Sequence, residues 1–340
     1  MKNNFWEKLK KSNKLIYALA PMAGITDSAF RQICKEFGAD VVYSEMASAT
    51  ALAYNPKKTL EMLQSSKKEA PCVIQLFGNS PENFAKSVKL LTNKKEIAKF
   101  QVSNFKLPQG IDINFGCPVN KVIKQGAGAA LMQDLKLSKE VIKSVIDNTD
   151  LPVSIKLRSK VGTGCNLSLQ IDCLRFLDYM KDLPISAVMI HGRTSAQGFS
   201  GPVDAEIIKK ARNYFNGIIL ANGGVMDCQD ARNLLNKTGA DGIGIARGAL
   251  GRPWIFSDVG CQTPPSSAER GWVSDVRNKE EVFKVALKHA KLAEKLKGRQ
   301  GIIEMRKHLC WYVHGLPGAR EMRQRLVKVE TIKDIEKILK

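Results

Sequence analysis

The stretch that decides the fold is Gly110–Lys121, GIDINFGCPVNK, in which a short strand runs directly into a turn. Its beginning alternates between apolar and polar residues, which is typical of a strand. Gly116 and Pro118 then favour a turn. The strand and turn carry Asn114 and Cys117. Because barrel enzymes place their chemistry at the carboxyl ends of their strands, the stretch predicts an amide and a thiol at such an end.

Seven further segments have the pattern of a short strand, and helical patterns separate them. The eight predicted strands are Ile16–Ala20, Val41–Ser44, Cys72–Phe77, Ile111–Asn114, Val153–Leu157, Ala187–Ile190, Ile218–Ala221 and Gly242–Ala246. The predicted helices are Asp27–Phe37, Glu82–Leu91, Ser138–Asn148, Leu167–Met180, Ala205–Tyr214 and Cys228–Asn236. This alternation implies parallel pairing, because parallel neighbours need a crossover connection. Eight such units over about 250 residues favour an α/β fold of the (β/α)8 TIM barrel type, with an open doubly wound sheet as the alternative.

The remaining sequence predicts a C-terminal small helical domain. We place the barrel at residues 1–258, a linker at 259–277 that contains Pro264 and Pro265, and the helical domain at 278–340. Residues 277–340 hold 17 Lys and Arg against 8 Asp and Glu, so this domain is basic. A lysine-rich segment at 92–110 precedes the fourth strand and is longer than a typical connection.

Composition and charge narrow the class of protein. The 340 residues have a formal net charge of +20, which favours a polyanionic partner, nucleic acid in particular, over a general lysine bias of the proteome. The eight cysteines include no Cys-x-x-Cys pair, so we expect reduced thiols in the cytoplasm rather than a disulfide framework. We expect no secretory leader, no membrane span and no obligate protein partner. His308, Cys310 and His314 lack further ligands for a closed zinc site, so we expect no metal.

The ends of the other predicted strands also carry groups suited to binding. Two turns, Asn222–Gly224 and Ala246–Arg247, follow strands seven and eight, where barrel enzymes often bind phosphate. The alternative is that these glycines only make tight turns. Lys156 and His191 each have an ordinary structural explanation, but together they predict a cationic rim for a ring that bears negative charge. No Gly-x-Gly-x-x-Gly motif follows a strand, so a separate Rossmann site is not supported.

Five motifs in unbroken order resemble the tRNA-dihydrouridine synthases, most closely the bacterial B-type subgroup. They are Pro21–Asp27 (PMAGITD), Asp112–Pro118 (DINFGCP), Ile190–Thr194 (IHGRT), Asn222–Gly224 (NGG) and Gly251–Phe256 (GRPWIF). His308–Arg320 (HLCWYVHGLPGAR) also resembles the helical domain of that subgroup. The resemblance implies an enzyme that holds FMN tightly without a covalent bond, takes electrons from NADPH and reduces specific uridines of tRNA to 5,6-dihydrouridine.

The resemblance also implies roles for individual residues. Those that would bind FMN are Pro21, Met22, Ala23, Gln75, Lys156, His191, Asn222, Gly223, Gly224, Ala246 and Arg247. Cys117 would be the general acid, and Asn114, Lys121 and Arg158 would face the uridine or its backbone. The basic helical domain would bind tRNA phosphates, mainly through salt-sensitive contacts.

The residue types suit this chemistry. Reduced flavin carries negative charge near N1, which the ammonium of Lys156 would stabilise. Hydride transfer from flavin N5 to C6 of the uracil builds enolate-like charge, and C5 must then be protonated. A thiol is mostly protonated at neutral pH, so Cys117 can supply that proton. Since no separate nucleotide fold is apparent, NADPH and tRNA would take turns at one flavin face.

One position departs from the family pattern. Ala246 stands where the family commonly has glycine before the phosphate-binding arginine.

Three other interpretations of the function stay open. They are an FMN barrel that acts on a free pyrimidine, an RNA-binding protein that has lost its chemistry, and a flavin-free phosphate-binding lyase or isomerase. The basic tail disfavours the first, and intact Cys117, Lys156 and His191 disfavour the second. The lack of an evident acid–base carboxylate pair disfavours the third.

Overall fold

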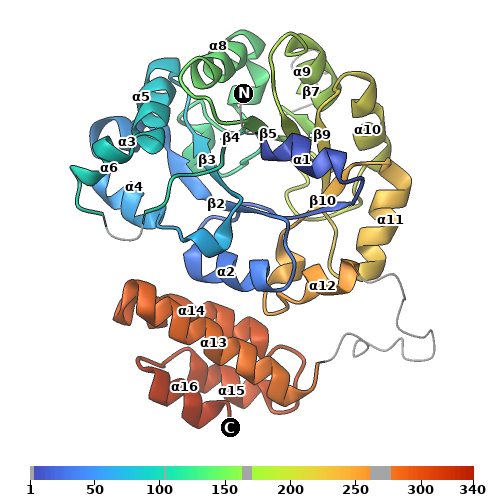
Figure 1. Cartoon of the computed structure of the whole chain (residues 1–340). Helices are drawn as coiled ribbons and strands as arrows, with labels where there is room; N and C mark the ends of the chain where they lie inside the picture. Colours follow the sequence, from blue (N-terminus) through green and yellow to red (C-terminus); the bar gives the residue numbers. More distant parts are fainter. Residues whose placement is uncertain (1–3, 103–104, 163–170, 261–276) are drawn as a thin grey trace.

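The structure, a computed structural model, describes residues 4–102, 105–162, 171–260 and 277–340. Within them, eight parallel strands form a closed barrel in the order β1-β10-β9-β8-β5-β4-β3-β2 (Figure 1). The strands are β1 Ile16–Leu19, β2 Val41–Ser48, β3 Cys72–Phe77, β4 Gly110–Asn114, β5 Val153–Arg158, β8 Ala187–His191, β9 Ile218–Asn222 and β10 Gly242–Ile245. Because β1 pairs with both β2 and β10, the sheet has no free edge. The prediction of a TIM barrel is confirmed, and the open sheet is excluded.

The predicted strand ends agree with the observed ones to within one residue, with β2 as the exception. This strand continues to Ser48, four residues beyond its predicted end at Ser44. Its register against β3 shifts between Tyr43 and Met46, and this irregularity interrupts the alternating pattern on which the prediction depended. A short antiparallel pair outside the barrel, β6 Lys160–Val161 with β7 Ile171–Asp172, was not predicted.

The predicted helices correspond to α2, α5, α8, α9, α10 and α11. The helices that accompany the barrel are α1 Phe5–Lys11, α2 Ser28–Glu36, α3 Ala49–Tyr54, α4 Lys57–Met62, α5 Pro81–Thr92, α6 Lys94–Ala98, α7 Asn120–Ile123, α8 Leu135–Ile146, α9 Cys173–Tyr179, α10 Ala205–Lys210, α11 Cys228–Thr238 and α12 Ile255–Gly260. Side chains that accept a hydrogen bond at the N-cap define where several of them begin. These are Asp27, Ser80, Asp134, Asp172, Asp204 and Asp227. The first residues of the predicted helix Leu167–Met180 lie outside the described residues, as do 103–104 of the segment 92–110.

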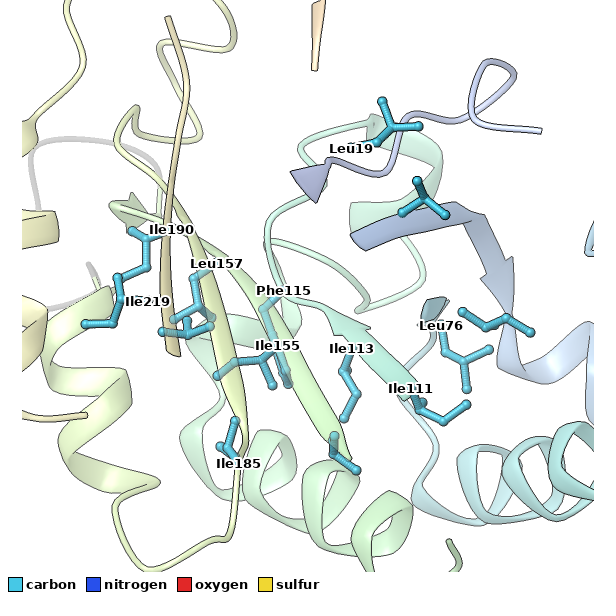
Figure 2. Packing of buried hydrophobic residues seen from close by; sticks show 14 of the residues in the cluster. Leu19, Leu76, Ile111, Ile113, Phe115, Ile155, Leu157, Ile185, Ile190 and Ile219 are labelled. Carbon is cyan, nitrogen blue, oxygen red and sulfur yellow. The ribbon is translucent and has the colours of Figure 1, made fainter. Parts of the chain in front are cut away.

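Alternation along each strand sorts the apolar side chains into two cores. Ile111, Ile113 and Ile155 belong to the larger core, between the outer faces of the strands and the helices (Figure 2). Residues on the opposite faces, such as Val73 and Met189, belong to a separate core inside the barrel. The polar residues of β4 and β5 therefore also face the barrel interior.

Helix α1 closes the amino-terminal end of the barrel and was missing from the sequence prediction. Asn4 caps it and also donates through Nδ2 to Ser186 Oγ at 3.2 Å. Trp6 is 1% exposed and packs in the same core as Ile16 and Ile218 at the starts of their strands. With this end filled by an indole, the polar side chains gather at the carboxyl ends of the strands.

Four further helices form a bundle beside α2 and α12 (Figure 1). They are α13 Lys279–Lys297, α14 Arg299–Tyr312, α15 Ala319–Leu326 and α16 Ile332–Ile338. Their shared apolar core also contains Ala29 of α2 and Trp254, which precedes α12. Lys297 pairs with Asp27 at 2.8 Å at the same junction. The helices predicted for 278–340 are confirmed, whereas the predicted linker falls largely on residues 261–276, outside the described residues.

Candidate active site

Polar residues replace apolar ones where the inward-facing strand positions reach the carboxyl end of the barrel. These residues are Gln75, Asn114, Lys156, His191 and Asn222, one from each of β3, β4, β5, β8 and β9. The strand register places Asn114 beside Lys156 and His191 beside Asn222. Alternation and register thus bring residues from distant parts of the chain into one mouth, as the sequence predicted.

A chain of hydrogen bonds joins β3, β4 and the loop that carries the thiol. Gln75 Nε2 donates to Asp112 Oδ2 at 2.7 Å, and Gln75 Oε1 accepts from Asn114 Nδ2 at 2.9 Å. Asn114 Oδ1 accepts from the backbone N–H groups of Gly116 and Cys117, at 3.0 and 2.9 Å. Asn114 therefore fixes the turn that presents Cys117.

Arg158 holds the same turn from the other side. Its Nε donates to the carbonyl of Gly116 at 2.8 Å, and its Nη1 donates to the carbonyls of Thr194 and Gly198 at 2.8 and 3.0 Å. The side chain is buried. Arg158 thus ties the exit of β4 to the exit of β8, and Cys117 remains half-buried beside it.

Lys156 and Asp112 are ionisable groups inside the barrel with shifted pKa values. Burial, followed by the nearby charge of Arg158, lowers the pKa of Lys156 to about 8, against the opposing effect of Asp112 and Cys117. Burial raises the pKa of Asp112 to about 6, although hydrogen bonds from Ser154 and Gln75 oppose the change. At neutral pH the mouth therefore contains one carboxylate and one ammonium, both poorly hydrated.

His191 lies between these cations and the glycine turn after β9. Burial lowers the pKa of His191 far below its usual range, and the cations around it add to the effect. The ring is thus neutral at neutral pH. Among the described residues, its Nε2 is buried and has no hydrogen-bond partner. A buried polar atom in this condition is costly, and it marks a position suited to a ligand.

The turn after β9 brings the backbone close to the imidazole. Asn222 Nδ2 donates to the carbonyl of Gly244 at 2.7 Å, which fixes the end of β9. Gly223 and Gly224 have φ values of 111° and 75°, which side-chain-bearing residues rarely adopt. A Cβ on Gly223 would lie 2.5 Å from Cδ2 of His191. Glycine is thus required here by both conformation and space.

Two residues of this region were missed by sequence reasoning. Arg193 donates from Nε to the carbonyl of Gly201 at 2.8 Å, and its buried Nη1 has no partner within the described residues. Phe199 is exposed, and the guanidinium of Arg247 lies over its ring at 4.7 Å from the centroid. Arg193 lies within the motif Ile190–Thr194, but its contribution depends on a loop conformation that no local pattern reveals. Ala246, the residue that departs from the family pattern, precedes Arg247 at the exit of β10.

The exit of β1 connects the mouth to the C-terminal helices. The N–H of Met22 donates to Thr26 Oγ1 at 3.1 Å. The N–H of Gly24 donates to the carboxylate of Glu45, and Lys307 of α14 donates to the carbonyl of Gly24. A groove of about 590 Å³ lies here, bordered by these last three residues and by others of α4, α13 and α14.

Some predicted residues lie at the rim instead of in the buried cluster. Pro21 and Met22 are half-buried, whereas Ala23, Lys121 and Arg247 are exposed. In the described residues no group of three or more potential metal ligands occurs, and His308 packs between Phe30 and His289. In the described part of the chain, no helix combines the length and apolar character needed to span a bilayer.

Comparison with known families places the barrel from residue 18 onwards and the helical bundle in one family. The model of a family described as dihydrouridine synthase (Dus) matches residues 18–340. A tRNA-dihydrouridine synthase B of Pseudomonas syringae pv. tomato is 33% identical over 315 residues, covering 92% of this chain and 86% of the relative. A probable tRNA-dihydrouridine synthase of Mycobacterium tuberculosis is 31% identical over 339 residues, covering 94% and 80%.

Solved structures with a similar fold are distant in sequence. Histamine dehydrogenase from Rhizobium sp. 4-9 matches with a TM-score of 0.51 at 12% identity. The match covers 81% of this chain and 48% of that one, so this chain spans about half the length of the dehydrogenase. At this identity the similarity shows the fold alone.

Proposed function

The chain belongs to the dihydrouridine synthase family and is an enzyme of that family, and we propose that it uses FMN and NADPH to reduce uridines of tRNA to 5,6-dihydrouridine. The observation that carries the proposal is the placement of Cys117. Its loop is held by Asn114 and Arg158 in the mouth that also contains Lys156 and the glycine turns. This arrangement offers a proton donor beside a cradle for a flat anionic group.

The residues of the mouth fit an FMN molecule. Two buried nitrogens, His191 Nε2 and Arg193 Nη1, have no partner among the described residues and suit an anion or a ring carbonyl. Gly223 and Gly224, both with positive φ, make a turn of the kind whose backbone N–H groups bind phosphate. The residues that would hold the cofactor are Pro21, Met22, Ala23, Gln75, Lys156, His191, Asn222, Gly223, Gly224, Ala246 and Arg247.

Bound flavin would supply the hydride that is added to C6 of the uracil. Cys117 would donate the proton to C5, and Asn114 would hold the thiol in position through the loop N–H groups. Lys156 would stabilise negative charge at the ring system. Lys121 is free to approach the nucleotide backbone from the rim, while Arg158 would support the uridine site by holding Gly116.

The tRNA would span the mouth and the basic helical bundle. A paired uridine is unreachable inside a barrel mouth, so the target base must be presented unstacked. The bundle contributes most of the 17 Lys and Arg of residues 277–340, and it borders the groove beside the β1 exit. Phosphate contacts of this kind weaken as salt rises.

The visible spectrum of the purified protein tests the proposal most directly. We expect a yellow protein that NADPH bleaches and that anaerobic addition of unmodified tRNA re-oxidises. A yellow protein indifferent to tRNA but oxidised by a free pyrimidine would favour the small-molecule oxidoreductase. A protein that takes up no flavin, even when FMN is supplied, would exclude both flavin-dependent functions.

Replacing Gly223 with alanine should weaken FMN binding by about ten- to hundredfold, because the added Cβ would approach Cδ2 of His191 to 2.5 Å and displace the imidazole from its position in the mouth. Flavin retained after gel filtration measures the effect. The matched control is Gly239→Ala, where φ is 61° but a Cβ meets nothing within 4 Å. Equal flavin loss in both variants would refute the close contact as the cause.

The rate of flavin reduction by NADPH should fall as pH rises through about 8. Lys156 is an ammonium below its pKa of about 8 and neutral above it, so the stabilising charge disappears on the alkaline side. Lys156→Met should be slower by about 10²-fold at pH 7 and should not show this decline. Stopped-flow absorbance between pH 7 and 9.5 measures both enzymes. A decline that persists in Lys156→Met would assign the titration to another group.

A further inference from the structure

Asp112 is a buried carboxylate whose charge has no role in the proposed chemistry. It lies on β4 two residues before Asn114 and is 0% exposed. It has no place in the proposed FMN or uridine sites. The charged or titratable groups that face it are Lys156 of β5 and Tyr43 of β2. Its direct hydrogen bonds come from Ser154 Oγ at 2.6 Å and Gln75 Nε2 at 2.7 Å.

The direction of each hydrogen bond in this region follows from Asp112. A carboxylate only accepts, so Gln75 must turn its amide nitrogen toward it. The oxygen of Gln75 then accepts from the amide nitrogen of Asn114. This leaves Asn114 Oδ1 as the acceptor for the N–H groups of Gly116 and Cys117. If Gln75 reversed its amide, its nitrogen would face the nitrogen of Asn114, and Asn114 would have to turn away from the loop.

We propose that Asp112 is a positioning residue for Cys117, acting through the ordered amides of Gln75 and Asn114. The proposal rests on the proposed function only where it concerns the proton transfer to tRNA. The position of the thiol itself is a property of the loop and is measurable without any substrate. The burial of Asp112, which keeps water from competing for Gln75, makes the orientation dependent on this single acceptor.

The test compares Asp112→Leu with Asp112→Asn in the holoenzyme. Leucine is similar in size but removes the acceptor. Asparagine retains it, because its oxygen can face Gln75 while its nitrogen donates to the Ser154 hydroxyl. Asp112→Leu should therefore slow re-oxidation by tRNA about tenfold, and Asp112→Asn should restore most of that rate. The matched control is Ser154→Ala, which removes the other partner of Asp112 and should leave the rate unchanged.

Alkylation of Cys117 by iodoacetamide provides a readout that needs no tRNA. In Asp112→Leu, Cys117 should react about fivefold faster with iodoacetamide, because the loop loses the restraint of about one hydrogen bond. Cys228 and Cys310 are also half-buried and serve as internal references, since general loosening would accelerate all three. Gln75→Met is the second variant if Asp112→Leu folds poorly. It interrupts the same chain of hydrogen bonds at its middle and should raise the alkylation rate of Cys117 by a similar factor.

A double-mutant cycle decides whether the effect passes through Asn114. In an Asn114→Ala background, Asp112→Leu should have no further effect on the alkylation of Cys117. Independent effects would overturn the proposal, as would an Asp112→Asn enzyme as impaired as Asp112→Leu, since charge alone would then explain the role. Altered alkylation in an enzyme that never reacts with tRNA would support the positioning and refute the proposed function.

Discussion

Replacing Cys117 with alanine should slow the re-oxidation of the reduced enzyme by tRNA by about 10²–10⁴-fold, the usual contribution of a positioned general acid. Reduction by NADPH should be unchanged, because the thiol serves only the protonation of the uracil at C5. Anaerobic stopped-flow experiments separate the two half-reactions. Dihydrouridine in the tRNA product, measured by mass spectrometry, should decrease in proportion.

The control for this change is Cys228→Ala, which removes another half-buried thiol at the start of α11. It should leave both half-reactions as they are. If Cys117→Ala retained the full rate with tRNA, the proton on C5 would come from solvent and not from the thiol. In that case the loop held by Asn114 and Arg158 would serve binding and not proton transfer.

The residues at the strand ends were predictable because the two-residue alternation that defines a strand also decides which side chains face the barrel interior. Inward-facing positions alternate along each strand, so Asn114 and Lys156 could be assigned to the same mouth from sequence spacing. The tight turn at Gly223 was equally visible, since two consecutive glycines follow a short apolar strand. These features depend on neighbours within a few residues.

The rest of the site depends on contacts between distant segments. The resemblance to the family assigned Arg158 to the substrate, yet its guanidinium is occupied by backbone carbonyls of two loops. Asp112 was placed in the motif without a role, because its partners Gln75 and Ser154 come from neighbouring strands. Helix α1 lacked any signal that its indole fills the end of the barrel. Side-chain partners across strands have no local sequence pattern.

Replacing Glu69 with alanine should lower the free energy of unfolding by about 3–5 kcal/mol, because it leaves a buried guanidinium without its counter-charge. Glu69 and Arg31 are each 0% exposed and pair at 2.7 Å. Glu69 also accepts from Ser28 Oγ at 2.5 Å and from the N–H of Ser66 at 2.7 Å. Urea unfolding followed by tryptophan fluorescence measures the change.

The loss should extend to the active site, since Arg31 also holds the exit of β1. Its Nη1 donates to the carbonyl of Thr26 at 2.7 Å, and Thr26 in turn accepts from the N–H of Met22 at the mouth. We therefore expect Glu69→Ala to retain less flavin than the parent at temperatures where both are folded. Glu82→Ala is the matched control, because its ion pair with Lys86 is exposed and separate from the mouth. If the two variants unfolded at the same urea concentration, the buried pair would contribute nothing beyond a surface pair. If Glu69→Ala retained as much flavin as the parent, the β1 exit would owe its shape to the Asp27–Lys297 contact with the helical bundle instead.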